Sequence, residues 1–227
     1  ILGGRDPYGA HAPASTIKPL LAMVVMDQVA PDAAMRATAA NTDVECSCVG
    51  LVPGAVYTAR QLLDALLMVS GNDAANALAD MVGGYRVAVQ KMNFKAAQLG
   101  ARNTRAGSPS GLDGPGWESV TTAHDLAVIY RAALNYPLFT QIIHQSTASF
   151  PDGRGGVKQI ASHDDLLPDY PGFIGGKTGY TNLAKETYVA MAQRGGTRLV
   201  AVMMYGSDDL WDQGRALLDW GFSQSGQ

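Results

Sequence analysis

The spacing of apolar residues changes near residue 145, and this change constrains the fold more than any other feature of the chain. Before it, apolar residues recur every three or four positions, as in the segment 17–29, which is the spacing of a helix face. After it, two runs rich in β-forming residues, 187–192 and 198–205, flank Gly195-Gly196-Thr197, a sequence typical of a hairpin. Helices grouped in the middle and strands grouped toward the end predict an α+β fold with an antiparallel sheet.

The same spacing, together with helix start and stop signals, predicts the individual elements. Helices are predicted over 15–29, 58–68, 73–81, 85–99, 122–134 and 208–222. Thr58 is expected to cap the second helix, and Pro19 lies in the first turn of the first, where its missing N–H costs little. An extended segment is expected over 146–150, whereas glycine and proline predict loops over 1–14, 103–120 and 151–172.

Length and charge restrict the class of protein. The 227 residues suffice for a single domain, with a helical lobe over 15–145 and a sheet lobe formed by 1–14 and 146–227. The net charge of −3, from 17 basic and 20 acidic side chains, disfavours binding to nucleic acid. No apolar run reaches the ~18–20 residues that span a bilayer, so membrane association is expected only through an anchor outside this chain.

Residues that often bind metals are too few or too scattered to suggest a metal site. Cys46-Ser47-Cys48 offers two thiols, too few for zinc, and we expect structurally minor thiols, with closure of a small disulfide ring as the alternative. The four histidines, including His163, lack metal-ligand spacing and are expected at the surface or at helix caps. The pairs Asp164-Asp165 and Asp208-Asp209 are expected in solvated turns or at caps. No metal and no cofactor are therefore predicted.

Three short motifs, each present once, point to chemistry at a serine. Ser15-Thr16-Ile17-Lys18 has the S-x-x-K spacing, Ser70-Gly71-Asn72 has the S-x-N spacing, and Lys177-Thr178-Gly179 is K-T-G. Each motif alone is weak, but the ordered trio is expected by chance in only about one sequence in a thousand of this composition. The combination therefore favours a common site.

The S-x-x-K motif suits nucleophilic catalysis. Residues three apart on a helix share a face, so the amine of Lys18 should lie beside the hydroxyl of Ser15 and remove its proton if the amine is neutral. Burial in an apolar helix disfavours the charged form, and Lys177 is a candidate second ammonium that would do the same. Unpaired N–H groups at the helix start near Ser15 could stabilise an oxyanion.

The other two motifs offer groups for relay and for binding. Ser70 offers a hydroxyl for proton relay, and Asn72 offers an amide that could hold a substrate peptide group. Lys177 and Thr178 on a strand edge could bind a carboxylate, and Gly179 would let a substrate backbone come close.

The chain resembles the serine D-alanyl-D-alanine carboxypeptidases, the low-molecular-mass penicillin-binding proteins, and most of all their actinobacterial members. The segments that carry the resemblance span nearly the whole chain: PASTIK (13–18), LLMVSGNDAANA (66–77), SGLDG (110–114), TTAHDLA (121–127) and GGKTGYT (175–181). The resemblance implies a single penicillin-binding catalytic domain, 1–227, with a helical lobe, a sheet covered by helices, and the active site in the cleft between them.

The resemblance also implies an activity and a set of roles. Ser15 would be acylated by a peptidoglycan stem peptide ending in D-Ala-D-Ala, with Lys18 as general base and Ser70 passing protons. Asn72 would shape the site, and Lys177, Thr178 and Thr181 would hold the terminal carboxylate. The N–H groups of Ser15 and Tyr180 would form the oxyanion hole. β-Lactams would acylate Ser15 as substrate mimics, and the substrate implies action outside the cytoplasmic membrane.

The sequence departs from the family pattern in two places. Only 14 residues precede Ser15, where the family usually has a leading helix and strand, so one sheet strand is expected to be missing from this chain. Many members place an arginine near the start of the last helix to help bind the carboxylate. Here that stretch is 206–213 and holds none, and the nearest arginines are Arg198 and Arg215.

Three alternatives stay open on the sequence. A class A β-lactamase needs a glutamate for deacylation, and the only one between Asn72 and Lys177 is Glu118, which lacks the expected surrounding pattern. A non-catalytic penicillin-binding sensor module would not need the intact Ser15 and Lys18. A transpeptidase or endopeptidase would share the acyl-enzyme and differ only in the acceptor or the peptide cleaved.

Overall fold

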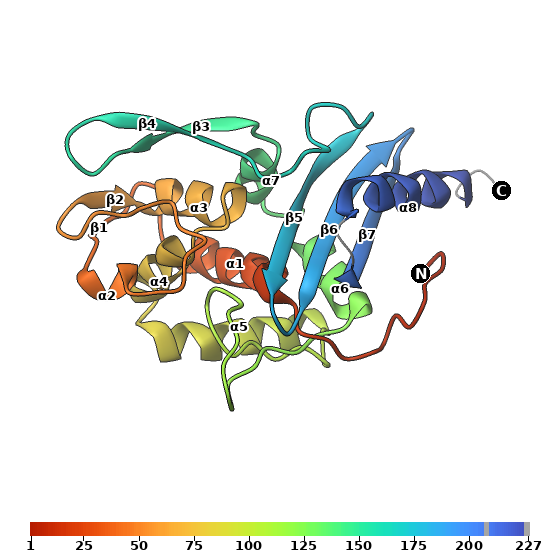
Figure 1. The fold of residues 1–227 in the computed structure, drawn as a ribbon, viewed down its shortest axis with the longest axis horizontal. Coiled ribbons are helices and arrows are strands. Elements are labelled where there is room, and N and C mark those ends of the chain that lie inside the picture. The colour runs from red at the N-terminus through yellow and green to blue at the C-terminus, as the bar shows by residue number, and fades with distance from the viewer. Residues whose placement is uncertain (207–208, 225–227) are drawn as a thin grey trace.

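Helices lie on one side of the molecule, and a three-stranded sheet with one covering helix lies on the other (Figure 1). The computed structural model describes residues 1–206 and 209–224. Its helices are the 3-10 helix η1 (Ala14–Ile17), α1 (Lys18–Gln28), α2 (Ala39–Thr42), α3 (Ala59–Met68), α4 (Asn72–Met81), α5 (Tyr85–Leu99), α6 (Ala123–Ala133), α7 (Pro137–Ile143) and α8 (Leu210–Gln224). Its strands are β1 (Ala34–Arg36), β2 (Val56–Thr58), β3 (Thr147–Pro151), β4 (Val157–Ala161), β5 (Phe173–Thr181), β6 (Lys185–Arg194) and β7 (Thr197–Gly206).

The main sheet is antiparallel, in the order β5-β6-β7, and β6 is buried on both faces. Successive side chains of a strand point to opposite faces. Accordingly, Tyr188 and Ala190 pack with Leu218 of α8, whereas Val189 and Met191 belong to the core formed by the helices. This arrangement confirms the predicted α+β class and the hairpin between β6 and β7. It also leaves β5 as an edge strand facing η1.

Helix α1 runs through the centre of the helical part and is buried from Lys18 to Val25. A helix that is apolar on all sides requires neighbours on all sides, and α1 contacts α3, α4, α5 and α6. A lysine at its first position is thereby taken out of water. None of the described helices combines the length and the apolar character needed to cross a membrane.

The first helix differs from its prediction in one detail. The segment begins as the 3-10 turn η1, and regular α-helix starts at Lys18 rather than at Ser15. Proline has no N–H, so Pro19 cannot donate to Ser15 O, and Lys18 N–H donates to that carbonyl instead. Ser15 thus lies in the 3-10 turn that leads directly into α1, whose first residue is Lys18.

The remaining helices largely follow the predictions. Thr58 caps α3 as expected, with Gln61 completing the capping box. The predicted start of the last helix at Asp208 lies outside the described residues, and so does half of the pair Asp208-Asp209. Helix α7 is not among the predicted helices, because it is short and begins at Pro137, and a proline soon after a helix usually marks its end.

A second hairpin, β3–β4, lies outside the main sheet. The extended segment near 146–150 is confirmed, but β4 falls in the stretch 151–172 predicted as loop. The Asp152 carboxylate accepts N–H bonds from Arg154 and Gly156 and so closes the turn. Phe150 packs in the helical core and stacks on Tyr57. The hairpin therefore packs against the helical part, and the division into lobes at residue 145 stays a prediction.

The N-terminal segment does not add a strand to the main sheet among the described residues. It runs along the opposite side of the molecule from the hairpin (Figure 1), and His11 bridges to Thr121 and stacks near Tyr205. Gly3 lies against the ring of Trp220 in α8. These contacts place Gly3 beside α8 and His11 beside β7, while Pro7 O accepts the N–H of His124 at the start of α6.

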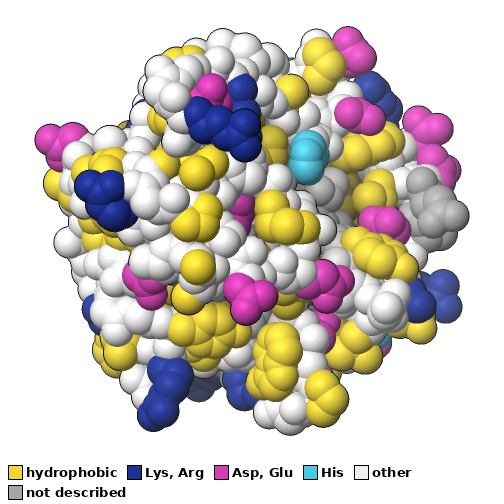
Figure 2. All heavy atoms as spheres, turned by 60° about the vertical axis from the view of Figure 1, so that its left-hand side comes forward, with side chains coloured by type: hydrophobic (Ala, Val, Ile, Leu, Met, Phe, Trp, Pro, Cys, Tyr) yellow, Lys and Arg dark blue, Asp and Glu magenta, His cyan; other side chains and the backbone are white. Residues whose placement is uncertain are grey.

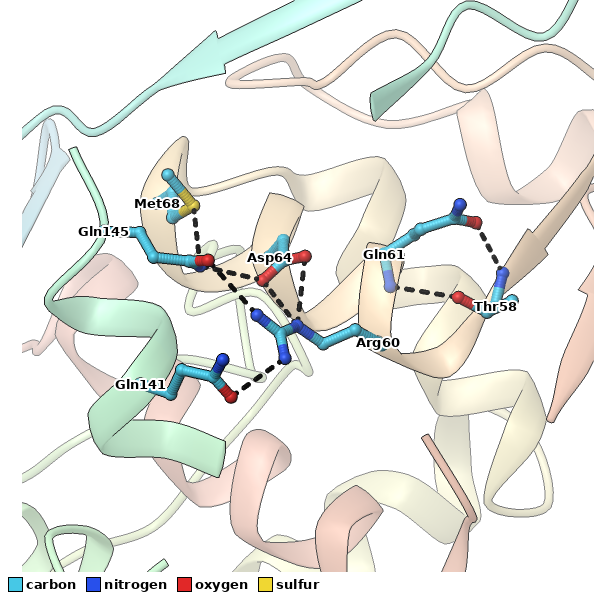
Figure 3. A network of polar contacts seen from close by, with 7 residues as sticks. All are labelled: Thr58, Arg60, Gln61, Asp64, Met68, Gln141 and Gln145. Carbon is cyan, nitrogen blue, oxygen red and sulfur yellow. Dashed lines mark hydrogen bonds and ion pairs between the residues drawn. The ribbon is translucent and has the colours of Figure 1, made fainter. Parts of the chain in front are cut away.

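A polar network fixes α3 against α7 (Figure 3). The Arg60 guanidinium pairs with the Asp64 carboxylate at 3.0 Å and also donates to the side-chain carbonyls of Gln141 and Gln145. Gln145 returns a hydrogen bond to Asp64 and contacts the sulfur of Met68. Because α3 ends at Met68, two residues before Ser70, the network helps to set where the S-x-N motif begins.

Candidate active site

A cleft of about 300 Å³ lies between the helical part and the edge strand β5. The residues of the three motifs that line it, together with the two that follow K-T-G, are Ser15, Ser70, Asn72, Thr178, Gly179, Tyr180 and Thr181. Lys18 and Lys177 do not line the cleft but are buried beside it, with 0% and 4% exposure. The structure therefore brings together the predicted site residues from three distant parts of the sequence.

The position of Ser15 depends on two glycines that leave room for its backbone. Ala14, directly before it, has φ +48°, a left-handed conformation that costs a non-glycine residue about 1–2 kcal/mol. A Cβ at Gly111 would collide with the carbonyl of Ala14, and a Cβ at Gly179 would lie 2.7 Å from Ser15 N. Gly179 is therefore needed by the protein itself, in addition to the predicted access for a substrate backbone.

Lys18 has three oxygen partners around its amine. Nζ lies 2.7 Å from Ser15 Oγ, 2.8 Å from Asn72 Oδ1 and 2.7 Å from the carbonyl oxygen of Ser110. The two carbonyl oxygens can only accept, whereas the Ser15 hydroxyl can also donate. A neutral amine would thus spend its two N–H groups on Asn72 and Ser110 and direct its lone pair at the Ser15 proton.

The surroundings favour this neutral form. Burial is the main cause that holds the pKa of Lys18 well below its ordinary value, and the charge of Lys177 adds to it. The Asp73 carboxylate acts in the opposite direction. Burial also lowers the pKa of Lys177 to about 7, against the pull of the Asp164 carboxylate. The charge of Lys177 thus acts on Lys18 in the direction expected from the sequence, whereas Lys177 itself loses charge through burial.

Asp164 corrects an expectation, because it is buried rather than part of a solvated turn. Its carboxylate accepts hydrogen bonds from the Tyr188 hydroxyl at 2.9 and 3.1 Å and from Leu166 N. Burial raises the pKa of Asp164 to about 6. The carboxylate is a partial counter-charge for Lys177, and no local pattern around residue 164 indicates this role.

Ser70 and Asn72 occupy a strained turn at the start of α4. Ser70 has φ +60°, and Gly71 N–H donates to Ala65 O at 3.0 Å, which ties the turn to α3. Asn72 reaches Lys18 through Oδ1, while its Nδ2 donates to the carbonyl oxygen of Glu45 at 2.7 Å. Asn72 is thus held inside the protein as well as facing the cleft.

On β5, Thr181 has a partner that the sequence did not predict. Its hydroxyl donates to Asp113 Oδ2 at 2.7 Å and accepts a hydrogen bond from Ala184 N at 3.0 Å. Lys177 Nζ donates to the carbonyl oxygen of Thr178 at 2.7 Å. In an edge strand, every second N–H points away from the neighbouring strand and is free to bind a ligand. The proposed role of Tyr180 requires its N–H to be one of these outward-facing groups.

Several cleft residues were missed by sequence reasoning. They are Glu45, Cys46, Ser47, Gly111, Leu112, His163 and Glu186. His163, predicted at the surface, is exposed and lines the cleft. Partial desolvation by the cleft walls lowers its pKa, and the charge of Lys177 lowers it further. The SGLDG segment (110–114), which carried part of the resemblance, was the available signal for the Ser110 and Asp113 contacts.

The expectation of two free thiols is wrong. Cys46 and Cys48 form a disulfide, with their Cα atoms 4.8 Å apart, within the usual bridging range. One intervening residue brings the two side chains together once the loop turns, which the sequence left as the alternative. Within the part of the chain that the structure describes, no three His, Cys, Asp or Glu side chains cluster as metal ligands would.

Two further candidates are placed away from the cleft. Glu118 accepts a hydrogen bond from Gly116 in its own loop and is not among the residues that line the cleft, which disfavours the β-lactamase alternative. Arg198 donates to Gln193, and Arg215 faces the ring of Tyr170. Over the described residues, then, no arginine lines the cleft, and Ser207 and Asp208 of the stretch 206–213 lie outside them.

The surface carries charges of both signs. The face in Figure 2 shows acidic, basic and apolar side chains side by side, so its described atoms form no continuous basic area. Nucleic-acid binding usually relies on a basic patch or stripe.

Comparison with known proteins adds independent evidence. The family model described as D-alanyl-D-alanine carboxypeptidase matches residues 1–208. The chain is 55% identical to D-alanyl-D-alanine carboxypeptidase DacB2 of Mycobacterium tuberculosis over all of its length and 79% of that protein. It is 30% identical to D-alanyl-D-alanine carboxypeptidase DacF of Bacillus subtilis over 99% of the chain, but spans only 59% of DacF.

Solved structures agree with these sequence matches. The crystal structure of a D-alanyl-D-alanine carboxypeptidase from M. tuberculosis has a TM-score of 0.94 and 56% identity, covering 97% of this chain and 85% of that one. The Streptomyces K15 DD-transpeptidase has a TM-score of 0.89 and 28% identity, covering 98% of this chain and 92% of that one. These findings confirm the predicted fold and the actinobacterial resemblance. The chain belongs to the D-alanyl-D-alanine carboxypeptidase family, peptidase family S11.

Proposed function

We propose that this protein is a serine D,D-carboxypeptidase that removes the terminal D-Ala from peptidoglycan stem peptides through an acyl-enzyme at Ser15. The observation that carries the proposal is the buried amine of Lys18, 2.7 Å from Ser15 Oγ, with two carbonyl oxygens taking its N–H groups. Because both N–H groups of a neutral Lys18 are used in these two hydrogen bonds, its lone pair points toward the Ser15 hydroxyl. The family match supplies the substrate class.

The reaction follows from this geometry in two halves. Ser15 Oγ attacks the carbonyl carbon of the scissile peptide bond while its proton passes to Lys18 Nζ. The attack produces a tetrahedral intermediate whose former carbonyl oxygen is an oxyanion. The C–N bond then breaks, and the leaving amine takes a proton that Lys18 returns, with Ser70 as the relay. In the second half a water gives a proton to Lys18 and attacks the ester carbon. The bond between that carbon and Ser15 Oγ then breaks, and Lys18 returns the proton to Ser15 Oγ.

The binding roles are proposed from where the side chains lie. Lys177 and Thr178 would receive the terminal carboxylate of the substrate, together with the Thr181 hydroxyl, whose hydrogen bond to Asp113 would have to rearrange. The N–H groups of Ser15 and Tyr180 would hold the oxyanion. Asn72 would contact the substrate peptide group. No step requires a metal or a cofactor, because each proton has a protein group to receive it.

Substrate chemistry also supports proposals on partners and location. Peptidoglycan lies outside the cytoplasmic membrane, so the protein is proposed to act there, and the disulfide is compatible with an oxidising compartment. β-Lactams are proposed as covalent inhibitors that acylate Ser15.

Release of D-alanine distinguishes the proposed reaction from its alternatives. A stem-peptide mimic ending in D-Ala-D-Ala should yield free D-alanine with water as acceptor, while penicillin should be hydrolysed far more slowly than it acylates the protein. Both products can be followed by mass spectrometry on one preparation. Fast penicillin hydrolysis without D-alanine release would favour a β-lactamase, and release only with an added amine acceptor would favour a transpeptidase.

The rate should depend on pH through both buried lysines. Because burial lowers the pKa of Lys18, kcat/KM for the peptide should rise at acid pH as Lys18 loses its proton. Lys177, with a pKa of about 7, binds a carboxylate as an ammonium, so kcat/KM should fall above about pH 7. An ester substrate without a carboxylate should keep the acid limb and lose the alkaline one. A peptide profile that still rises from about pH 7 to about pH 9 would contradict the role of Lys177.

A further inference from the structure

The Cys46–Cys48 disulfide closes a small ring in the wall of the cleft. Two backbone carbonyl groups in and next to this ring accept hydrogen bonds from Asn72. Ser47 O, inside the ring, accepts the backbone N–H of Asn72 at 2.7 Å. Glu45 O, one peptide before the ring, accepts Asn72 Nδ2 at 2.7 Å. The loop therefore holds Asn72 by its backbone and by its side chain.

This double contact decides which end of the Asn72 amide faces Lys18. With Nδ2 donating to Glu45 O, the acceptor Oδ1 is turned to Lys18 Nζ at 2.8 Å. If the amide turned over, its NH₂ group would face Lys18. The lone pair of the neutral amine would then be drawn to that group instead of to the Ser15 hydroxyl. The position of the Glu45 carbonyl thus directs the base toward its nucleophile.

Among the described residues, one further hydrogen bond holds this part of the loop, from the Ser47 hydroxyl to Val69 O at 3.3 Å. Glu45, Cys46 and Ser47 are exposed and lie in irregular backbone between α2 and β2, so apolar packing does not fix them. Beyond Cys48 the loop is well anchored, because the buried Asp73 carboxylate accepts the N–H groups of Val49, Gly50 and Leu51 at 2.8–3.0 Å. Ordering free residues costs backbone entropy, and a covalent ring lowers that cost at residues 46–48.

We infer that the Cys46–Cys48 disulfide is a positioning element of the active site, which holds the Glu45 and Ser47 carbonyls so that Asn72 turns the lone pair of Lys18 toward Ser15. The inference rests on the proposed roles of Ser15 and Lys18. In this role the disulfide takes no part in the chemical step. It acts through Asn72, and its loss should therefore slow acylation without preventing folding.

Reduction of the disulfide tests this inference directly. Cys46 is exposed, so dithiothreitol should reach it; the reagent gives two electrons and two protons, becomes a cyclic disulfide and leaves two thiols. After its removal under anaerobic conditions, acylation by a fluorescent penicillin is measured across pH. The rate constant should fall by about 10- to 100-fold, the usual effect of misplacing a catalytic group by roughly 1 Å. One penicillin per chain should still bind.

The pH profile separates positioning from damage. Loosening the cleft wall should let water reach Lys18 and move the acid limb of acylation to higher pH, while the charges that act on Lys18, Lys177 and Asp73, are unchanged. The double variant Cys46→Ser/Cys48→Ser should show the slow rate and the shifted limb from the start, and should not respond to dithiothreitol. Reoxidation should restore the parent only.

Two results would overturn the inference. One is an unchanged rate and limb in a protein with two titratable thiols per chain; the other is a smaller acylated fraction at an unchanged rate, which indicates unfolding. Amide hydrogen exchange at Asn72 gives a readout that needs no activity, and its N–H should exchange faster after reduction. If the oxidised parent forms no adduct with penicillin, the proposed function is wrong. If reduction leaves hydrogen exchange at Asn72 unchanged, the disulfide does not hold Asn72, whatever the activity shows.

Discussion

Ser15→Ala should abolish the covalent adduct with penicillin. In the parent, intact mass should increase by the mass of one penicillin per chain, because ring opening adds the drug without a leaving group. The variant lacks Oγ, the atom that lies 2.7 Å from Lys18 Nζ. Loss of the nucleophile removes the acyl-enzyme route, so D-alanine release should fall by at least about 10³-fold.

Ser70→Ala is the matched control, since Ser70 is the other serine of the motifs, is buried and lines the same cleft. It should still form one adduct, more slowly, because the nucleophile and its base remain while the relay is lost. Non-covalent binding of penicillin to Ser15→Ala should persist, since only one oxygen is removed. An adduct on Ser15→Ala that maps to Ser70 by peptide mass analysis would show that the assignment of the nucleophile is wrong.

Lys18→Arg should reduce the acylation rate by about 10²–10⁴-fold, the usual contribution of a general base. The guanidinium stays protonated in proteins and therefore cannot accept the Ser15 proton. The measurement is the rate of fluorescent-penicillin labelling over a range of pH. Besides being slow, the variant should lose the acid limb that Lys18 produces in the parent, because no group at position 18 titrates there.

Folding must be checked in this variant, because position 18 is fully buried and arginine is larger than lysine. Lys18→Met has nearly the same shape as lysine, removes the amine and should give the same loss of acylation with a preserved circular dichroism spectrum. Normal labelling by a folded Lys18→Met protein would exclude Lys18 as the base. Restoration of the rate by a small added amine would support it.

Local patterns predicted the elements well where one periodicity persists over several turns. The capped helix at Thr58, the long helix that ends before Gly100 and the hairpin through Gly195 and Gly196 all appear as expected. Short elements failed, as with α7 and β4, because a few residues carry too little periodicity to compete with proline or glycine signals. The disulfide at Cys46 was left open, since two cysteines close in sequence pair only if the loop between them turns.

The local sequence carries the chemistry that is available: a serine and a lysine three residues apart in a helix, an S-x-N turn and a K-T-G strand. How these groups act on one another depends on the packing of the fold. Lys18 meets Asn72 across 54 positions and the Ser110 carbonyl across 92, and burial among helices lowers its pKa. Such contacts depend on packing between distant segments, which no local spacing encodes, and they direct the lysine lone pair at Ser15.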